Sequence, residues 1–216
     1  MSTQRRVEIR SYRPADRAAV RRLCCDTGFL GGPIDPVFED REMFADYLTR
    51  YYTDCEPESA YVVCVNDEVR GYLLGSRRPF LQQAFNVWNN LRLLARGLWS
   101  YRGYNAASKR FIRWIFTQAW REVPAAPRRT AHFHFNVMPD ARQLATARAL
   151  VDAYLAHLRA HGEKRVYGQI VVFEDRRGSA LFERYGFKVL NKSEITKYRD
   201  VHPEKVYLCT VVKELV

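Results

Sequence analysis

The sequence contains no run of 18 apolar residues, so we expect no membrane-spanning helix. Residues 1–14 are polar and charged and lack the apolar segment of a secretory signal, which favours a cytoplasmic protein with reduced thiols. The five cysteines are sparse and odd in number among 216 residues, which excludes a disulfide-rich mini-protein. Neither a CxxC nor an HExxH motif is present, so we expect no metal site.

The overall composition is that of a folded protein. Hydrophobic residues make up 47% of the chain and aromatic residues 13%, which excludes a disordered chain. A length of 216 residues favours a single domain, spanning residues 1–216.

Positive charge is concentrated in one segment, residues 77–129. The whole chain has a net charge of +11, and this segment holds eleven lysines and arginines but a single acidic residue, Glu122. The segment also holds all four tryptophans, which are Trp88, Trp99, Trp114 and Trp120. A segment with its own composition inside a nearly neutral domain is typical of an insertion or a specialised surface.

Hydrophobic periodicity and turn residues predict an alternation of strands and helices. We expect strands at 7–13, 60–65, 69–76, 130–138, 165–173, 187–198 and 205–214. We expect helices after residue 14, at 39–52, at 80–99 and 106–121 inside the insertion, at 143–161, and in a short segment ending near residue 185.

Two segments carry a family resemblance. Residues 136–150 read NVMPDARQLATARAL, which is similar to a strand ending in V-x-P followed by a helix that begins (Q/R)-x-x-G-x-(G/A). Residues 175–187 read DRRGSALFERYGF, which is similar to N-x-x-A-x-x-F-Y-E-x-x-G-F. Together they resemble the GNAT superfamily of acetyl-CoA-dependent N-acetyltransferases, over about residues 7–76 and 130–215.

The resemblance implies an α/β fold of the GNAT-like acyl-CoA N-acyltransferase type. This fold is a mixed, twisted, mainly antiparallel sheet with helices on both faces, here with a helical insertion at about 77–129. The strands at 130–138 and 165–173 would be parallel and splay apart to admit the pantetheine arm of acetyl-CoA, the co-substrate. The acceptor would be a primary amine on a small molecule or peptide.

The first motif has a physical basis, because a helix N-terminus offers unpaired N–H groups and a partial positive charge to a pyrophosphate. The family's two loop glycines fall on Ala145 and Ala147, which are small but disfavour positive φ. Arg142 and Arg148 would add positive charge. The cofactor-binding residues that the resemblance implies are Phe135, Asn136, Val137, Arg142, Gln143, Leu144, Ala145, Thr146, Ala147, Arg148, Asp175, Gly178 and Phe182.

The second motif departs from the family where many relatives have a tyrosine that reprotonates the CoA thiolate. That position is Phe182 here, and phenylalanine has no proton to donate. Tyr185 is a candidate replacement, but helical geometry places it about 300° round the helix from Phe182. The acid role is therefore filled by Tyr185, filled by water, or absent, in which case Tyr185 is a core aromatic residue.

A row of polar side chains supplies the catalytic candidates. His132, His134 and Asn136 share one face of the predicted strand 130–138 by period two. Histidine suits proton removal near neutral pH, so His134 is the first candidate for the base and His132 the second. The alternative is a partly buried histidine pair that is hydrogen-bonded to the sheet. Further carboxylates that could bind a cationic amine are Asp35, Glu39, Asp40, Asp54 and Glu56.

Three interpretations of the insertion stay open. It forms a helical lid over the acceptor site, it binds an acidic acceptor or the CoA phosphates, or it binds nucleic acid or an anionic membrane surface. Two functions also remain. The first is transfer of an acetyl group from acetyl-CoA to an amine, and the alternative is a catalytically silent acyl-CoA-binding module that recognises an acidic partner through the insertion.

Overall fold

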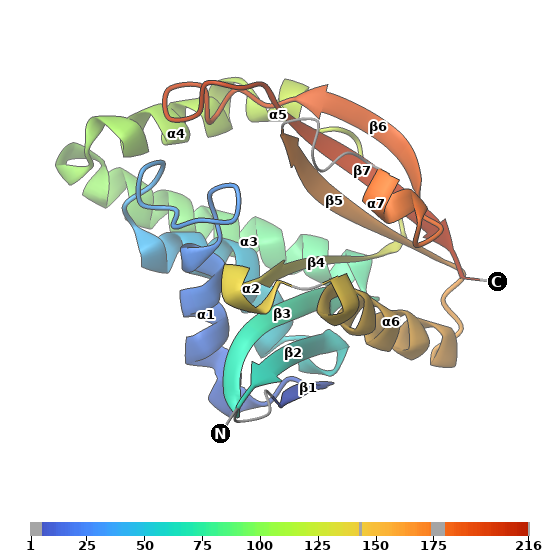
Figure 1. Cartoon of the computed structure of the whole chain (residues 1–216). Helices are drawn as coiled ribbons and strands as arrows, with labels where there is room; N and C mark the ends of the chain where they lie inside the picture. Colours follow the sequence, from blue (N-terminus) through green and yellow to red (C-terminus); the bar gives the residue numbers. More distant parts are fainter. Residues whose placement is uncertain (1–5, 143, 174–179, 216) are drawn as a thin grey trace.

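The computed structural model describes residues 6–142, 144–173 and 180–215, and these form one seven-stranded sheet (Figure 1). The strand order is β1-β2-β3-β4-β5-β7-β6. Only β4 and β5 pair in parallel, and the other neighbours are antiparallel. The strands are β1 (Val7–Ser11), β2 (Ala60–Val65), β3 (Glu68–Ser76), β4 (Ala131–Val137), β5 (Arg165–Phe173), β6 (Lys188–Glu194) and β7 (Val206–Glu214).

Helices cover both faces of the sheet. The helices are α1 (Arg17–Asp26), α2 (Arg41–Asp54), α3 (Pro79–Ser100), α4 (Ala106–Thr117), α5 (Ala119–Glu122), α6 (Leu144–Ala160) and α7 (Ala180–Glu183). Local chemistry starts several of them: Asp40 and Asn105 cap α2 and α4 by accepting from the N–H groups of Met43 and Ser108. None of the helices in the described part of the chain is long and apolar enough to cross a bilayer.

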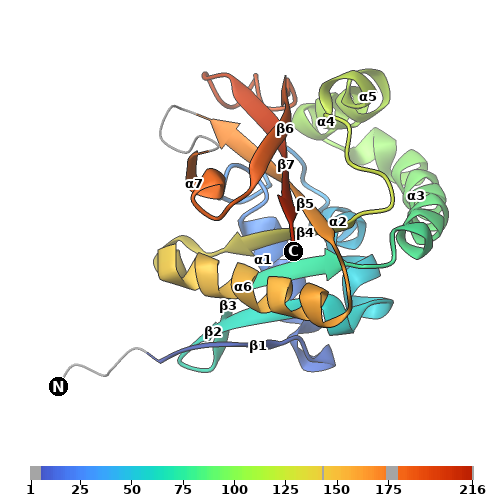
Figure 2. The ribbon, with the colours of Figure 1, turned by 90° about the vertical axis from the view of Figure 1, so that its right-hand side faces the viewer.

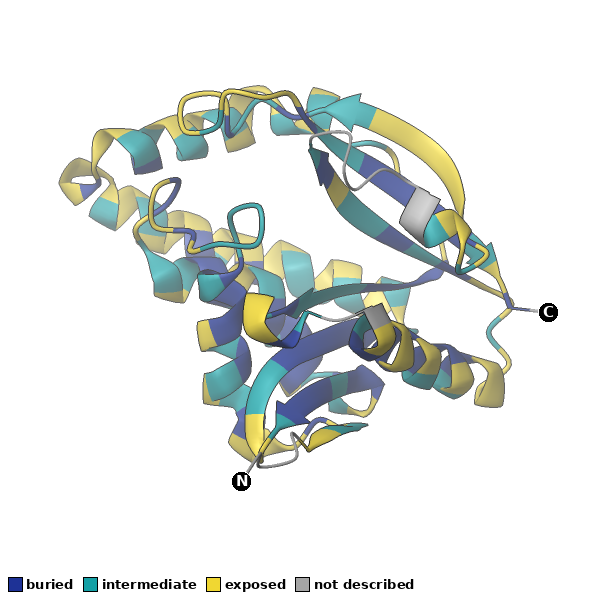
Figure 3. Cartoon of the chain, viewed as in Figure 1, coloured by how far each residue is buried: buried dark blue, intermediate teal, exposed yellow. Residues whose placement is uncertain are grey.

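The alternation of side chains along the central strands builds two cores. On β3, Tyr72 and Leu74 pack with α1 and α2, whereas Leu73 points to the other face and packs with α6. On β4, Phe133 and Val137 join the α6 core. Figure 3 shows buried residues along these strands, whereas the helices of the insertion carry much exposed surface. The expected mixed sheet with helices on both faces is confirmed.

The insertion is helical, as the periodicity predicted, and its helices α3, α4 and α5 lie together along one edge of the molecule, on the right of Figure 2, while α6 runs across the front of that view. Its basic residues hold it to the rest of the domain: Arg92 pairs with Asp46, Arg96 with Asp40, and Arg110 with Asp200. These arginines are therefore partnered rather than simply solvated, and they fix α3 and α4 around the site described below.

Two predicted elements end earlier than expected. The helix predicted at 106–121 is interrupted at Gln118, which separates α4 from α5. The strand predicted at 187–198 ends at Glu194 in β6, and residues 195–205 then lead to β7. In this connection Thr196 binds the carboxylate of Glu122 at the end of α5 through both its backbone N–H and its hydroxyl, each at 2.7 Å. Neither the interruption nor this contact is visible in the local sequence pattern.

Candidate functional site

The two parallel strands separate in the middle of the sheet. β4 and β5 pair only over Ala131–Val166, His132–Tyr167 and Phe133–Gly168. Beyond Phe133, β4 still pairs with β3 as far as Val137, whereas β5 continues with β7 as far as Phe173. The edge of β4 after Phe133 therefore faces the cavity described next, which is the divergence that the family resemblance implied.

A cavity of about 1710 Å³ occupies this opening. Its walls come from β4 and β5, from α3 and α4, and from the loop after α1. The cavity is largely apolar, and no aspartate or glutamate is found among its lining residues in the described part of the chain. The cationic residues that line it are Arg113, Arg142, Arg184 and Lys197.

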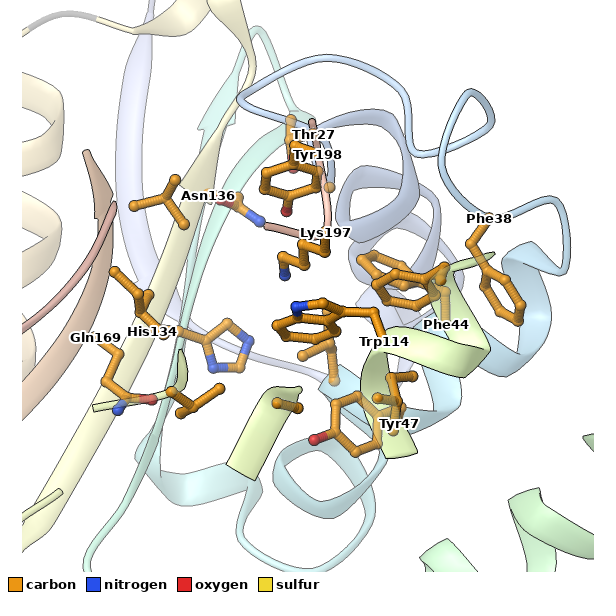
Figure 4. A pocket seen from close by; sticks show the side chains of 18 of the residues that line it. Thr27, Phe38, Phe44, Tyr47, Trp114, His134, Asn136, Gln169, Lys197 and Tyr198 are labelled. Carbon is orange, nitrogen blue, oxygen red and sulfur yellow. The ribbon is translucent and has the colours of Figure 1, made fainter. Parts of the chain in front are cut away.

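His134 lines this cavity from β4 (Figure 4). Its ring packs edge-on against Tyr52 and Tyr72, with ring centroids 5.1 and 5.9 Å apart. Its Nε2 atom is buried, and no described residue provides a hydrogen-bond partner for it. Burial, with a smaller contribution from the neighbouring His132, lowers the pKa of His134 to about 3. The imidazole is thus neutral at physiological pH, with one ring nitrogen protonated and the other able to accept a hydrogen bond.

His132 lies in a different environment, although it occupies the same face of β4. It is not among the residues that line the cavity, and its Nε2 lies 2.9 Å from both Tyr52 Oη and Gln82 Nε2. Burial lowers its pKa to about 4, although the charge of Glu56 acts in the opposite direction. His132 is therefore hydrogen-bonded as the alternative for the pair expected, but to side chains of α2 and α3 rather than to the sheet.

The third member of the row, Asn136, lines the cavity together with Phe135 and Val137. The side chain of Asn136 donates to Tyr72 Oη at 2.9 Å, which fixes its orientation. These three residues lie on the part of β4 that has separated from β5.

The first turn of α6 lies close to the end of β4. Ala147 lines the cavity, Thr146 is buried, and Ala145 and Arg148 are exposed. Arg148 pairs with Asp152 one turn further along α6, at 3.5 Å. Gln143 lies outside the described residues, and the side chain of Leu144 is likewise not described.

Arg142 is bound to the protein itself. Its guanidinium donates to the carbonyl of Val137 at 3.1 and 3.3 Å, and it lies against Gly31. A side chain at position 31 would collide with it, so this glycine keeps the space open, at a φ of +91°. Arg142 therefore ties the start of α6 to the end of β4 at the rim of the cavity.

The second motif is only partly described, because Asp175 and Gly178 lie outside the described residues. Phe182 on α7 lines the cavity, and its ring lies 6.0 Å from that of Phe187 in the α6 core. Tyr185 does not line the cavity; its hydroxyl is buried without a described partner.

The candidate carboxylates do not reach the cavity. Glu56 is fully buried and accepts four hydrogen bonds, from Tyr51, Ser59, Ser76 and the backbone of Arg77. Burial alone would raise its pKa, but these bonds outweigh burial and lower it. The other four are bound to neighbouring groups: Asp35 to Arg41, Glu39 to Asn105, Asp40 to Arg96 and Tyr104, and Asp54 to Arg17 and Arg50.

Lys197 is a cavity residue that the sequence analysis did not single out. It follows Thr196 in the connection between β6 and β7, and its amino group lies over the rings of Phe111, Trp114 and Tyr198. Figure 4 shows this amino group and the imidazole of His134 pointing into the same cavity beside Trp114. The two aromatic residues of α4 and the lysine are more than 80 residues apart, so no local pattern connects them.

The comparisons with known proteins identify the fold. No family model matches the sequence, and no curated protein is similar enough to be recognised as a relative. Solved structures do match over almost the whole chain. SsHAT is 22% identical with a TM-score of 0.60, over 97% of this chain and 98% of its own.

Two further structures extend this likeness. An N-acetyltransferase from Staphylococcus aureus Mu50 is 13% identical, with a TM-score of 0.57 over 98% of this chain and 99% of its own. The protein yncA from Salmonella typhimurium, solved with its cofactor acetyl-CoA, is 13% identical, with a TM-score of 0.54 over 97% of this chain and 94% of its own. The resemblance to the GNAT acetyltransferases is thus confirmed at the level of the fold.

Proposed function

We propose that this chain, which has the fold of the GNAT acetyltransferases, transfers an acetyl group from acetyl-CoA to a primary amine. The observation that carries the proposal is the separation of β4 from β5 after Phe133, which opens the sheet at the cavity that His134 lines. The N-terminus of α6 lies beside this opening, where its free N–H groups suit a pyrophosphate. The solved acetyltransferases of the same fold support this assignment.

The residues around the opening suit the two ends of acetyl-CoA. The small residues Ala145 and Ala147 on the first turn of α6 leave room for the pyrophosphate, and Arg148 adds positive charge beside it. The pantetheine arm would lie along the separated edge of β4, beside Phe135 and Val137, with Phe182 on the opposite side. We assign Gln143, Leu144, Asp175 and Gly178 to the same site on the resemblance alone.

The reaction we propose needs no covalent enzyme intermediate. The bound amine attacks the thioester carbonyl carbon, the new C–N bond forms, and the C–S bond breaks to release CoA as a thiolate. Backbone N–H groups on the free edge of β4 would stabilise the negative charge on the carbonyl oxygen. The amine loses one proton to solvent, and the thiolate gains one from solvent because Phe182 has none to give.

His134 would orient the amine in this reaction. Its neutral imidazole would accept a hydrogen bond from the attacking amine through the ring nitrogen that carries no proton, and this bond would aim the lone pair of the amine at the thioester. Asn136, fixed by Tyr72, adds a polar group on the same wall of the cavity. His132 would hold β4 in place through its hydrogen bonds to Tyr52 and Gln82.

Calorimetry with acetyl-CoA tests the binding half of the proposal. The wild-type chain should bind acetyl-CoA, and Ala145→Trp should weaken binding because the indole would occupy the space at the first turn of α6. Ala149→Trp is the matched control, because Ala149 is also exposed on α6 but lies one turn further along. A folded chain that does not bind acetyl-CoA would refute the proposal.

The catalytic half is tested by release of the CoA thiol in the presence of an amine panel. Transfer requires thiol release that depends on the amine, together with a mass increase of one acetyl group on that amine. Binding of acetyl-CoA without transfer to any amine would instead identify the silent acyl-CoA-binding module.

A further inference from the structure

We propose that the amine acceptor of this cavity is an apolar molecule that carries one anionic group, and that Lys197 binds this group. The inference rests on the proposed acetyl transfer and adds the class of acceptor to it. Three features carry it, which are the walls of the cavity, the charge of its lining, and the surroundings of Lys197.

The insertion lines the cavity with apolar side chains from two helices, α3 and α4. Leu91, Leu94 and Leu98 line the cavity from α3, and Ile115 and Phe116 line it from α4. These side chains remain exposed to a large degree; Leu98 is 69% and Phe116 61% exposed. A contiguous exposed apolar lining of this kind marks a binding surface, and burying it favours an occupant with an apolar body.

The charge of the lining disfavours a cationic acceptor. No carboxylate lines the cavity in the part of the chain that the structure describes, whereas Arg113, Arg184 and Lys197 do. A polyamine or aminoglycoside that entered would lose water around several ammonium groups and meet like charges instead of partners. An acceptor with a single amine, which enters the cavity in its neutral form, avoids this cost of desolvation and repulsion.

No acidic side chain among the described residues forms an ion pair with Lys197. Its amino group lies 4.8 Å from the ring centroid of Tyr198 and 5.3 Å from that of Trp114. The two acids nearest in sequence are engaged elsewhere, because Glu194 pairs with Arg199 and Lys205 and Asp200 pairs with Arg110. An ammonium group held by aromatic rings inside an apolar cavity suits an anionic group of the ligand.

The positions of Lys197 and His134 give the acceptor a direction. Both project into the cavity, Lys197 from the connection before β7 and His134 from β4 next to the strand opening (Figure 4). An acceptor with its anion at Lys197 would present its amine toward His134 and the thioester. Trp114, beside both, would stack on an aromatic body.

Two probes of similar shape and opposite charge test the binding preference. Indole-3-propionate and tryptamine share an indole and a two-carbon chain, but one carries a carboxylate and the other an ammonium group. Calorimetry on the chain saturated with CoA should show tighter binding of indole-3-propionate, by roughly tenfold to a hundredfold. Equal binding, tighter binding of tryptamine, or no binding of indole-3-propionate would overturn the proposal.

The acceptor class is then tested by transfer. Tryptophan, which has both the amine and the carboxylate, should have a higher kcat/KM than tryptamine or spermidine. Lys197→Gln should lower kcat/KM for tryptophan by roughly tenfold to a hundredfold. Lys192→Gln is the matched control, because Lys192 lies 4.2 Å from the ring centroid of Tyr207 but outside the cavity. Spermidine as the best acceptor, or equal losses in both variants, would overturn the proposal.

These results separate the two levels of inference. A chain that does not bind acetyl-CoA refutes the proposed function before any acceptor is added. A chain that binds acetyl-CoA and acetylates spermidine in preference to tryptophan keeps the function and refutes only the acceptor class.

Discussion

His132 and His134 lie two residues apart on β4 and face the same side of the sheet, but among the described residues only His132 finds hydrogen-bond partners for its Nε2. Burial lowers the pKa of His132 to about 4 and that of His134 to about 3. Both rings are therefore neutral near pH 7. One imidazole is fixed by Tyr52 and Gln82, whereas the other lines the cavity and has a buried Nε2 without a described partner.

The pH dependence of the rate follows from this neutrality. A histidine with a pKa near its ordinary value of about 6.5 would give an ascending limb near neutral pH. Because the pKa of His134 is about 3, it cannot produce a limb near neutral pH. We expect kcat/KM instead to rise with pH up to the pKa of the acceptor's own amine, because only the unprotonated amine attacks. Profiles measured with two acceptors of different amine pKa should therefore be displaced from one another.

The variant His134→Ala tests the same point. It should lower kcat/KM by about tenfold to a hundredfold, the loss of one orienting hydrogen bond, and leave the position of the limb unchanged. A limb near pH 6.5 that disappears in His134→Ala would show that His134 titrates as the base after all.

The stability of the fold should also depend on these two residues. A histidine buried in the neutral form has a folded pKa below its unfolded pKa, so the unfolded chain binds more protons between the two values. The free energy of unfolding should therefore fall as the pH decreases from about 6.5 toward 4. Urea unfolding at a series of pH values measures this slope.

Replacement of both residues identifies their share of the slope. The double variant His132→Gln, His134→Gln should flatten it, leaving the part that comes from His157, whose pKa burial also lowers. The carboxylates with lowered pKa, such as Glu56 and Asp46, contribute below about pH 5 because their ordinary pKa lies near 4, so the histidine contribution is read from the slope between about pH 6.5 and 5. An unchanged slope in the double variant would contradict the assignment.

The sheet could be predicted because its signals are local. The alternation of polar and apolar residues along β4 depends on neighbours in sequence, as do the strands predicted at 60–65 and 69–76, and the structure confirms them. The separation of β4 from β5 followed from the family resemblance, not from periodicity, and it is also confirmed.

The site was less predictable because its chemistry depends on contacts between distant segments. The pattern placed His134 on the polar face of β4, but the tyrosines that bury it, Tyr52 and Tyr72, come from α2 and β3. Arg142 carries the charge expected for a phosphate site, yet its guanidinium binds the carbonyl of Val137. Lys197 is unremarkable in sequence and becomes a cavity residue only because α4 folds over it.

The packing of α6 against the sheet predicts a strong effect at Gly75 on β3. A Cβ at this position would overlap the ring of Tyr154, whose hydroxyl donates to the carbonyl of His132 at 3.0 Å. Gly75→Ala should therefore lower the free energy of unfolding by about 1–3 kcal/mol. Adding Tyr154→Leu should recover part of the loss, as measured by urea unfolding, whereas additive losses would contradict the overlap.

The cavity position of Phe182 predicts tolerance of a hydroxyl group. Phe182 is half-buried and lines the cavity, so Phe182→Tyr should keep kcat within a few fold or raise it by supplying a proton for the thiolate. Phe187→Tyr is the contrasting variant, because Phe187 is buried in the α6 core and its new hydroxyl would lack a partner. A collapse of kcat in a folded Phe182→Tyr protein would show that the cavity needs an apolar ring there.

Glu122 connects the insertion to the segment that carries Lys197, and this connection predicts an effect on acceptor binding. Its carboxylate accepts from the indole Nε1 of Trp114 at 2.6 Å and from Thr196. Burial would raise the pKa of Glu122, but these hydrogen bonds outweigh burial and lower it. The carboxylate is therefore charged at neutral pH and holds α4, α5 and residue 196 together.

The variant Glu122→Ala should lower the free energy of unfolding by about 1–3 kcal/mol, because the Trp114 and Thr196 donors lose their acceptor. It should also raise KM for the acceptor more than KM for acetyl-CoA, since Trp114 and Lys197 line the acceptor side while the first turn of α6 is unaffected. Glu194→Ala is the matched control, because Glu194 lies at the start of the same connection and its described ion pairs are with Arg199 and Lys205, outside the insertion. Steady-state kinetics with each substrate varied in turn measures the two effects. Equal increases in both KM values would mean that Glu122 stabilises the whole domain without positioning the acceptor wall.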